Sequence, residues 1–447
     1  MKLWQKDKTA LAEVEQFTVG QDPVLDMHLA PFDVLGSLAH IRMLESIGLL
    51  TAEELQVLSA ELRAIYRRIE SGDFGVEAGV EDIHSQVELE LTRKLGDVGK
   101  KIHSGRSRND QVLVDVKLYL RHEIREITIA VKALFDLLLE QSERYREHLL
   151  PGYTHLQLAM PSSYGLWFGA YAESLVDDLI TLEAAHRIVN KNPLGSAAGY
   201  GSSFPLNRRM TTELLGFDDL NYNVVYAQMG RGKTERIVAA ALSNIAATLA
   251  KQAMDACLFM NQNFGFIQFP DELTTGSSIM PHKKNPDVFE LIRARCNQII
   301  ALPGDIAMLT ANLPSGYHRD LQLLKEQLFP AIQHLKSCLS MMCLMLSNIE
   351  VKAGILEAER YKFLFSVEEV NKLVLAGVPF RDAYKQIGQA IEKGEFTYTT
   401  TLAHTHEGSI GNLQTESIRA MMTQTLGSFR FERWEEAERG LSERGGE

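Results

Sequence analysis

The stretch GSSIMPHKKNPD, residues 276–287, combines the residue types that chemistry on an anion needs. Two serines follow a glycine, where the chain bends freely, and two lysines stand side by side. Asn285, Pro286 and Asp287 have the order of a helix start: an N-cap, a proline at the first helical position and an acid. A polar loop with a capped helix explains the last three residues, but not the serines and lysines. We therefore expect a mobile catalytic loop that brings Lys283 and Asn285 to a helix N-terminus, where anions bind.

Two further stretches precede expected helices. KIHSGRSRNDQ (101–111) places two arginines beside a helix start, an arrangement that suits carboxylate recognition, although a solvated basic loop is the simpler interpretation of this stretch alone. PGYTHLQLAMP (151–161) holds Thr154 and His155 before what looks like a proline-started helix. A lone histidine is more often structural than catalytic, so this stretch is weak evidence by itself.

Two more stretches carry polar residues on expected helices. VEDIHSQVE (80–88) places acids and His84 at the head of a helix, which a capped, charged helix start also explains. In LPSGYHRDLQLLKEQ (313–327), Gln322 and Lys325 are three residues apart and share one helical face.

Two motifs resemble other kinds of site. MGRGKTER (229–236) contains the Gly-Lys-Thr of a P-loop, but Ala227 stands where that pattern requires its first glycine, so we do not expect nucleotide triphosphate binding. HTH (404–406) offers two metal ligands, but no further cluster has zinc spacing and HExxH is absent. We expect no catalytic metal.

Long helices must position these stretches. An apolar seam of near-heptad spacing predicts one helix over about 109–147. The seam residues are Val116, Leu120, Ile124, Ile127, Val131, Leu134 and Leu138. Similar patterns predict helices over 162–190, 233–262, 286–312 and 320–349, and the best strand signal is NYNVVYA (221–227). Because no single helix can bury such a seam, we expect an all-α bundle that associates with other subunits.

Composition limits the class of protein. The chain has 447 residues, 45% hydrophobic and 23% charged, and a net charge of −12, which argues against nucleic-acid or anionic-membrane partners. We expect three helical domains, over 1–105, 106–353 and 354–447. The opening, 1–16, lacks the apolar core of a signal peptide, and no uncharged apolar run reaches membrane-span length. Four cysteines without CxxC spacing indicate buried thiols and a reducing, cytoplasmic location.

Together these stretches resemble the fumarase/aspartase superfamily, whose loop GSSxMPxKxN matches 276–285 at every fixed position. Within it, the sequence is most similar to the argininosuccinate lyase family. The discriminating pieces are SGRSRNDQ (104–111), the double lysine of PHKKNPD (281–287) and LPSGYHRDLQLLKE (313–326). Recognisable motifs extend from residue 33 to residue 384.

The resemblance implies an all-α fold of three domains and a homotetramer with a central bundle of long helices. Each active site would be shared by three subunits. The implied reaction is cleavage of argininosuccinate to arginine and fumarate in arginine biosynthesis, without a cofactor or metal. Alternatives are another fumarate-releasing lyase of the superfamily, of the adenylosuccinate lyase or aspartase type, and a non-catalytic crystallin-like relative.

The resemblance also implies roles for single residues. Ser277 matches the base that removes the Cβ proton, and Glu290 matches a carboxylate that pairs with His155. His155 is implied either as proton acceptor or as part of an orienting network, and Lys283 and Asn285 as holding a substrate carboxylate. Other positions match substrate-binding residues: His84, Arg108, Asn109, Thr154, Arg231, Tyr317, Gln322 and Lys325.

Four departures from the family pattern concern substrate contacts. The family's tryptophan-glycine-glycine-arginine opening is reduced to LWQKDK (3–8), and its N-terminal serine has no clear counterpart in FTVGQD (17–22). The serine-acid-arginine-aspartate stretch appears as MGRGK (229–233), which retains only Arg231. The region SVEEVNKLVLAG (366–377) is also divergent.

Overall fold

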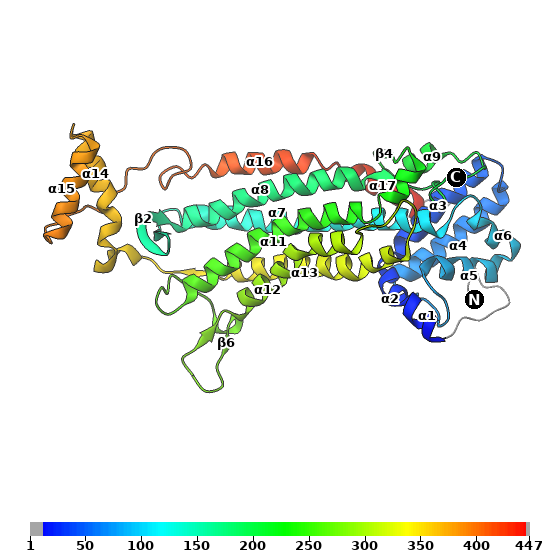
Figure 1. Cartoon of the computed structure of the whole chain (residues 1–447), viewed down its shortest axis with the longest axis horizontal. Helices are drawn as coiled ribbons and strands as arrows, with labels where there is room; N and C mark the ends of the chain where they lie inside the picture. Colours follow the sequence, from blue (N-terminus) through cyan, green and yellow to red (C-terminus); the bar gives the residue numbers. More distant parts are fainter. Residues whose placement is uncertain (1–11, 444–447) are drawn as a thin grey trace.

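A bundle of long helices runs along the longest axis of the molecule in the computed structural model, which describes residues 12–443 (Figure 1). The signal-peptide prediction for the extreme N-terminus and the LWQKDK comparison fall on residues outside this range. The bundle helices are α7 (Arg108–Arg144), α8 (Tyr164–Val189), α11 (Lys233–Met260), α12 (Asp287–Leu309) and α13 (Leu324–Ser347). The predicted all-α bundle is confirmed, with each predicted boundary within a few residues.

Smaller helices occupy both ends of the bundle. At the N-terminal end lie α1 (Ala12–Val19), α2 (Asp22–Leu25), α3 (Ala30–Ser46), α4 (Ala52–Glu70), α5 (Ile83–Leu95), α6 (Asp97–Lys100), α9 (Arg208–Leu214) and α10 (Val224–Met229). The C-terminal part supplies α14 (Ser366–Leu375), α15 (Phe380–Glu392), α16 (Thr415–Gly427) and α17 (Glu432–Ser442). Short 3-10 helices are Asp26–His28, Lys101–His103, Asp271–Leu273, Arg319–Leu323, Ile355–Glu357 and Glu359–Phe365.

The longest helix among the described residues is α7. Ser107 caps its start reciprocally with Asp110: Asn109 N–H donates to Ser107 Oγ, and Ser107 N–H donates to Asp110 Oδ1. All seven residues of the predicted seam are buried. At 1.5 Å per residue, its 37 residues span roughly 55 Å. Residues at the first turn of α7 are therefore far from residues that follow its last turn.

Within residues 12–443, four short two-stranded sheets complete the fold. The strand pairs are β1 (Leu149–Thr154) with β2 (Gln157–Ser163), β3 (Lys191–Asn192) with β4 (Asp219–Leu220), β5 (Ile267–Gln268) with β8 (Glu350–Val351), and β6 (Thr275–Gly276) with β7 (Lys284–Asn285). The β3–β4 pair is parallel and the others are antiparallel.

Three sequence predictions of local structure are wrong. The segment 221–227 is not a strand. The Asn223 side chain accepts hydrogen bonds from the N–H groups of Val225 and Tyr226, and it thereby caps the start of α10. Pro161 does not start a helix but lies in β2, and α8 begins after the cap Ser163. Pro286 is the N-cap of α12 rather than its first residue, since Asn285 is held in β7.

The C-terminal part runs in two directions. The helices α14 and α15 lie beyond the β1–β2 hairpin, whereas α16 and α17 return along the bundle (Figure 1). At the far end, buried Arg121 donates to Glu438 at 2.7 Å. Of the four cysteines, Cys296 and Cys338 are buried and the other two half-buried, and none forms a disulfide. Among residues 12–443, only α11 is long and apolar enough to cross a membrane, and 61% of its apolar window is buried.

Candidate active site

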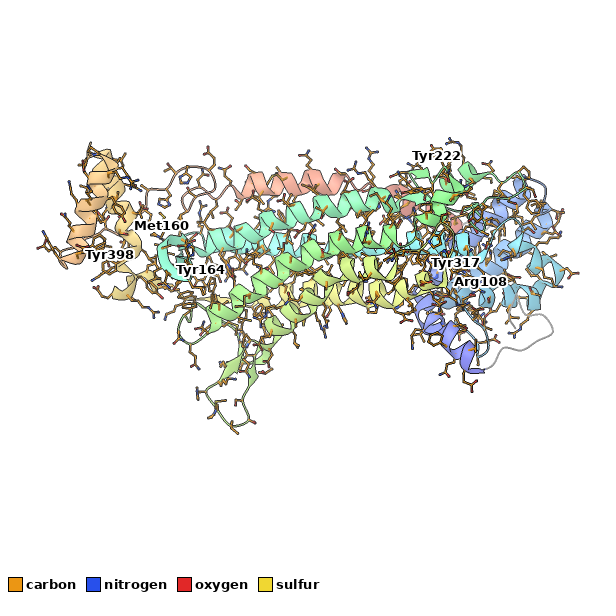
Figure 2. All side chains as sticks on the ribbon, viewed as in Figure 1. Arg108, Met160, Tyr164, Tyr222, Tyr317 and Tyr398 are labelled. Carbon is orange, nitrogen blue, oxygen red and sulfur yellow. The ribbon has the colours of Figure 1, made fainter. Side chains whose placement is uncertain are left out.

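A cavity of about 650 Å³ opens where the N-terminal helices meet the bundle. Figure 2 shows Arg108 and Tyr317 at this end of the molecule. The cavity is lined by Asp22, Asp26, Asp82, His84, His103, Ser107, Arg108, Asn109, Val112, Arg231, Tyr317, Arg319, Gln322 and Lys325. Seven predicted substrate-binding residues therefore meet in one place: His84, Arg108, Asn109, Arg231, Tyr317, Gln322 and Lys325.

Lys325 forms the floor of this cavity. The residue is 3% exposed, and its ammonium group pairs with Asp22 at 2.6 Å and with Asp26. Burial by itself would lower the pKa of Lys325, but the two carboxylates outweigh burial and raise it, so the lysine stays charged. Burial raises the pKa of Asp22 to about 6 against the opposing attraction of Lys325.

Opposite charges also alternate along the rim. Arg108, at the first turn of α7, pairs with Glu81 at 3.2 Å and with Asp82. Arg319 pairs with the other oxygen of Glu81 at 2.6 Å. Because the positive end of the α7 helix dipole also lies here, this rim can receive a carboxylate, while its acids can receive a cationic group. The cavity therefore suits a ligand that carries charges of both signs.

The remaining wall ties distant segments together. The Arg231 guanidinium donates to the Leu321 carbonyl at 3.2 Å and lies 5.8 Å from the centre of the Tyr317 ring. The Gln322 amide donates to the carbonyls of Thr18 and Val19, at 3.1 and 2.9 Å. The divergent segment FTVGQD thus lies against the cavity, held by the carbonyls of Thr18 and Val19 and by the side chain of Asp22.

Two histidines face the cavity in different states. Burial, with the Arg106 charge nearby, lowers the pKa of His103 to about 4, so it is neutral near pH 7. His84 has its Nδ1 between two buried carboxylates, and its pKa is raised although burial opposes this. Of the two arginines predicted to bind carboxylates, Arg106 is instead buried, and it donates to Ser37 Oγ at 3.0 Å. Of these two arginines, only Arg108 lines the cavity.

The loop 276–287 lies elsewhere, projecting from the bundle between β6 and β7 (Figure 1). A second cavity, of about 630 Å³, lies beside the loop's C-terminal half and includes Lys283, Asn285 and Glu290 in its wall. The half-buried Ser277 Oγ accepts hydrogen bonds from Met280 N–H at 3.1 Å and Ile279 N–H at 3.4 Å. Donors of this kind favour the alkoxide form of a hydroxyl.

His155 lies at the tip of the β1–β2 hairpin. Thr154 pairs with Gln157, so His155 and Leu156 form a two-residue turn, with φ of 53° and 57°. Such a turn normally takes Asn-Gly, because left-handed φ crowds the Cβ of other residues. His155 and Leu156 are both exposed. Two exposed residues in a conformation that disfavours them make this turn a candidate functional position, since strained residues cluster at such positions.

Within one chain, the cavity lies far from both His155 and the loop of Ser277. The cavity contains the start of α7 and His155 follows its end, roughly 55 Å away. The loop of Ser277 follows the end of α11, a 28-residue helix of roughly 42 Å that begins beside Arg231. No ion pair joins His155 to Glu290 within residues 12–443. The predicted pairing of these two residues stays a prediction.

Sequence reasoning missed three charged residues of the cavity: Asp22, Asp26 and Arg319. The spacing of Asp22 and Asp26, four apart in DPVLD, was the available signal, since it places both carboxylates on one helical face. Their position next to a lysine some 300 residues later in the chain was not readable without the fold.

A family model described as Lyase matches residues 12–301, about two thirds of the chain, so the chain belongs to this class of enzyme. Solved structures agree on the fold. An EDDS lyase variant with bound fumarate has a TM-score of 0.76 at 20% identity, covering 97% of this chain and 94% of that one. A class II fumarase from Schistosoma mansoni has a TM-score of 0.72 at 14% identity, covering 96% and 94%.

Curated relatives are much closer in sequence. Argininosuccinate lyase from Parabacteroides distasonis is 65% identical, and the match covers 98% of this chain and 99% of the relative. The enzyme of the same name from Bacteroides thetaiotaomicron is 64% identical over the same shares. The chain therefore belongs to the argininosuccinate lyase family, as its loop and arginine motifs predicted.

Proposed function

We propose that this chain cleaves argininosuccinate reversibly into arginine and fumarate, as a cytoplasmic enzyme of arginine biosynthesis. The observation that carries the proposal is the alternation of carboxylates and cations around the 650 Å³ cavity. Argininosuccinate carries three carboxylates, an ammonium and a guanidinium, so it needs partners of both signs. Malate has no cationic group, and the acids of this cavity would leave it poorly matched.

In the proposed mechanism, a base removes the Cβ proton and an acid protonates the leaving guanidine nitrogen. Proton removal next to a carboxylate creates an aci-carboxylate dianion, which cations and N–H donors stabilise more than they stabilise the substrate. Ser277 acts as the base, with its hydroxyl already accepting two backbone N–H groups. Lys283 and Asn285 hold the carboxylate where charge develops.

The site is completed by other copies of the chain in a homotetramer. The distance along α7 supports this, because the cavity and His155 lie at opposite ends of one rigid helix. Apolar side chains left exposed on the bundle also favour association: Ile180, Met254, Leu291, Ile300, Met308 and Leu344. We infer that Ser277, His155 and the cavity that includes Lys325 come from three subunits.

A substrate panel tests this function. The purified protein should release fumarate, followed by its ultraviolet absorbance, from argininosuccinate and far more slowly from adenylosuccinate, aspartate or malate. Preference for another fumarate adduct would assign the site to a different lyase of the superfamily. No turnover of any of the four would support the crystallin-like alternative.

A further inference from the structure

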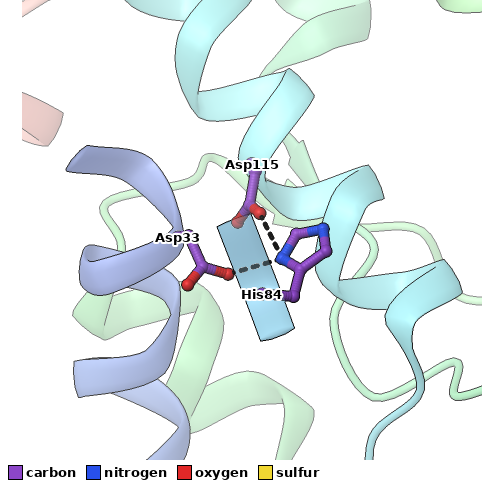
Figure 3. Close-up of side chains that lie close together, drawn as sticks. All are labelled: Asp33, His84 and Asp115. Atoms are coloured by element: carbon purple, nitrogen blue, oxygen red, sulfur yellow. Dashed lines mark hydrogen bonds and ion pairs between the residues drawn. The ribbon is translucent and has the colours of Figure 1, made fainter. Parts of the chain in front are cut away.

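Three helices bring Asp33, His84 and Asp115 together beneath the cavity, from α3, α5 and α7 respectively (Figure 3). Both carboxylates are fully buried, and the histidine is 5% exposed. His84 Nδ1 lies 2.7 Å from Asp33 Oδ1 and 3.4 Å from Asp115 Oδ2. The second ring nitrogen points away from both carboxylates in Figure 3, and His84 lines the cavity.

The two carboxylates differ in charge. Asp33 Oδ1 accepts a second hydrogen bond, from the Gln111 amide at 2.6 Å, and Asp33 Oδ2 is unpaired. Within the described residues, neither oxygen of Asp115 makes a hydrogen bond. Two carboxylates this close and this buried cannot both be ionised. Burial and the charge of Asp33 raise the pKa of Asp115 well above its ordinary value. The pKa of Asp33 is lowered, because the attraction of His84 outweighs the opposing effect of burial.

A proton on Asp115 accounts for the orphaned oxygens, since a protonated Asp115 can donate to Asp33. The cluster then consists of one carboxylate, one carboxylic acid and one imidazolium, with no net charge. The other ionisable groups around His84 are Asp82 at the N-cap of α5, Asp26 near Lys325, Arg106 before α7, and His103.

We propose that Asp33 and Asp115 are positioning residues that hold His84 as an imidazolium, with its Nε2–H directed into the cavity at a substrate carboxylate. Since the Nδ1–H is taken by Asp33, only Nε2 is free to bind a ligand. The inference rests on the proposed function, because it assigns the partner of one substrate carboxylate. It adds a further cation to a wall on which Arg108, Arg319 and Lys325 are already paired with acids.

A metal site is the competing interpretation of the same three residues, but the surroundings do not suit it. The 2.7 Å contact has the length of a hydrogen bond, and a cation here would be close to the buried Arg106 charge. The backbone of Gly36 packs over Asp115: a Cβ built there would lie 3.5 Å from Asp115 Oδ1. The backbone of Gly36 therefore covers one side of Asp115.

A matched pair of isosteric variants tests the proposal. In Asp115→Asn the amide donates to Asp33 as the protonated carboxyl does, so KM for argininosuccinate at pH 8 should rise less than about ten-fold, and several-fold less than in Asp33→Asn. In Asp33→Asn the imidazolium loses its anion, so KM for argininosuccinate at pH 8 should rise about 10- to 100-fold, as expected for a lost charged hydrogen bond. Relative to the wild type at the same pH, this loss should shrink as the pH is lowered, because removing the anion lowers the pKa of the buried His84 and more acid is then needed to protonate it.

Each outcome has a distinct meaning. An unchanged KM in Asp33→Asn, or more than about ten-fold loss in Asp115→Asn, would overturn the proposal, and the second test stands even if the first variant does not fold. Equal loss in both variants, with wild-type activity lost to a chelator and restored by a divalent metal, would establish a metal site instead. Wild-type turnover on the substrate panel is measured first, so that failure of the proposed function is seen separately.

Discussion

Replacing His155 with asparagine separates its chemical role from its structural one. The residue has a φ of 53° at a two-residue turn, a conformation that costs most side chains roughly 1–2 kcal/mol and that asparagine tolerates best after glycine. The variant should therefore be as stable as the wild type, or more stable by up to about 1 kcal/mol. If His155 transfers or orients a proton in the elimination, kcat should fall by about 10²- to 10⁴-fold.

The assay is fumarate release from argininosuccinate, with thermal unfolding followed in parallel. Leu156→Asn is the matched control, since it makes the same substitution at the neighbouring position of the same turn, where φ is 57°. It should retain much more activity than His155→Asn. An active His155→Asn variant, within about ten-fold of the wild type, would refute the assignment of His155 to the chemistry.

Three other variants test separate parts of the account. Ser277→Ala should abolish turnover while the oligomer seen by gel filtration survives, and retained turnover would reject Ser277 as the base. The pKa of Asp22 is about 6, so KM should rise as the pH falls below 6 and this carboxylate loses its charge. Asp22→Asn should have a high KM that no longer depends on pH in this range. If KM of the variant depends on pH as that of the wild type does, Asp22 takes no part in binding. Gly232→Ala should lower the free energy of unfolding by about 1–3 kcal/mol, because φ of Gly232 is +80° and the added Cβ would lie 2.6 Å from Thr310 Cγ2. An unchanged thermal unfolding temperature would contradict this packing.

The long helices were predictable because their apolar seams repeat over many turns. The buried seam of α7, from Val116 to Leu138, is an example in which each position reports the same face. The hairpin around His155 was not, because its prolines match a helix start and its turn lacks the glycine that marks most hairpins. Its strands are defined by pairing with each other, which no local pattern records.

The cavity was predictable only in part. Motifs identified Arg108, Gln322 and Lys325, since these lie in stretches of unusual composition. Asp22 and the Asp33–Asp115 pair lie in ordinary helical sequence, and their role depends on which charges the fold places beside them. Burial and proximity, which set the pKa of each carboxylate, exist only in the folded chain.

Mixing two inactive variants tests most directly the central claim, that one active site takes residues from different copies of the chain. His155→Asn and Ser277→Ala, co-expressed or unfolded and refolded together in equal amounts, form mixed oligomers. If the two residues reach each site from different subunits, about a quarter of the sites contain both wild-type side chains, and about a quarter of wild-type activity returns. Activity no higher than that of either variant alone would contradict the shared site.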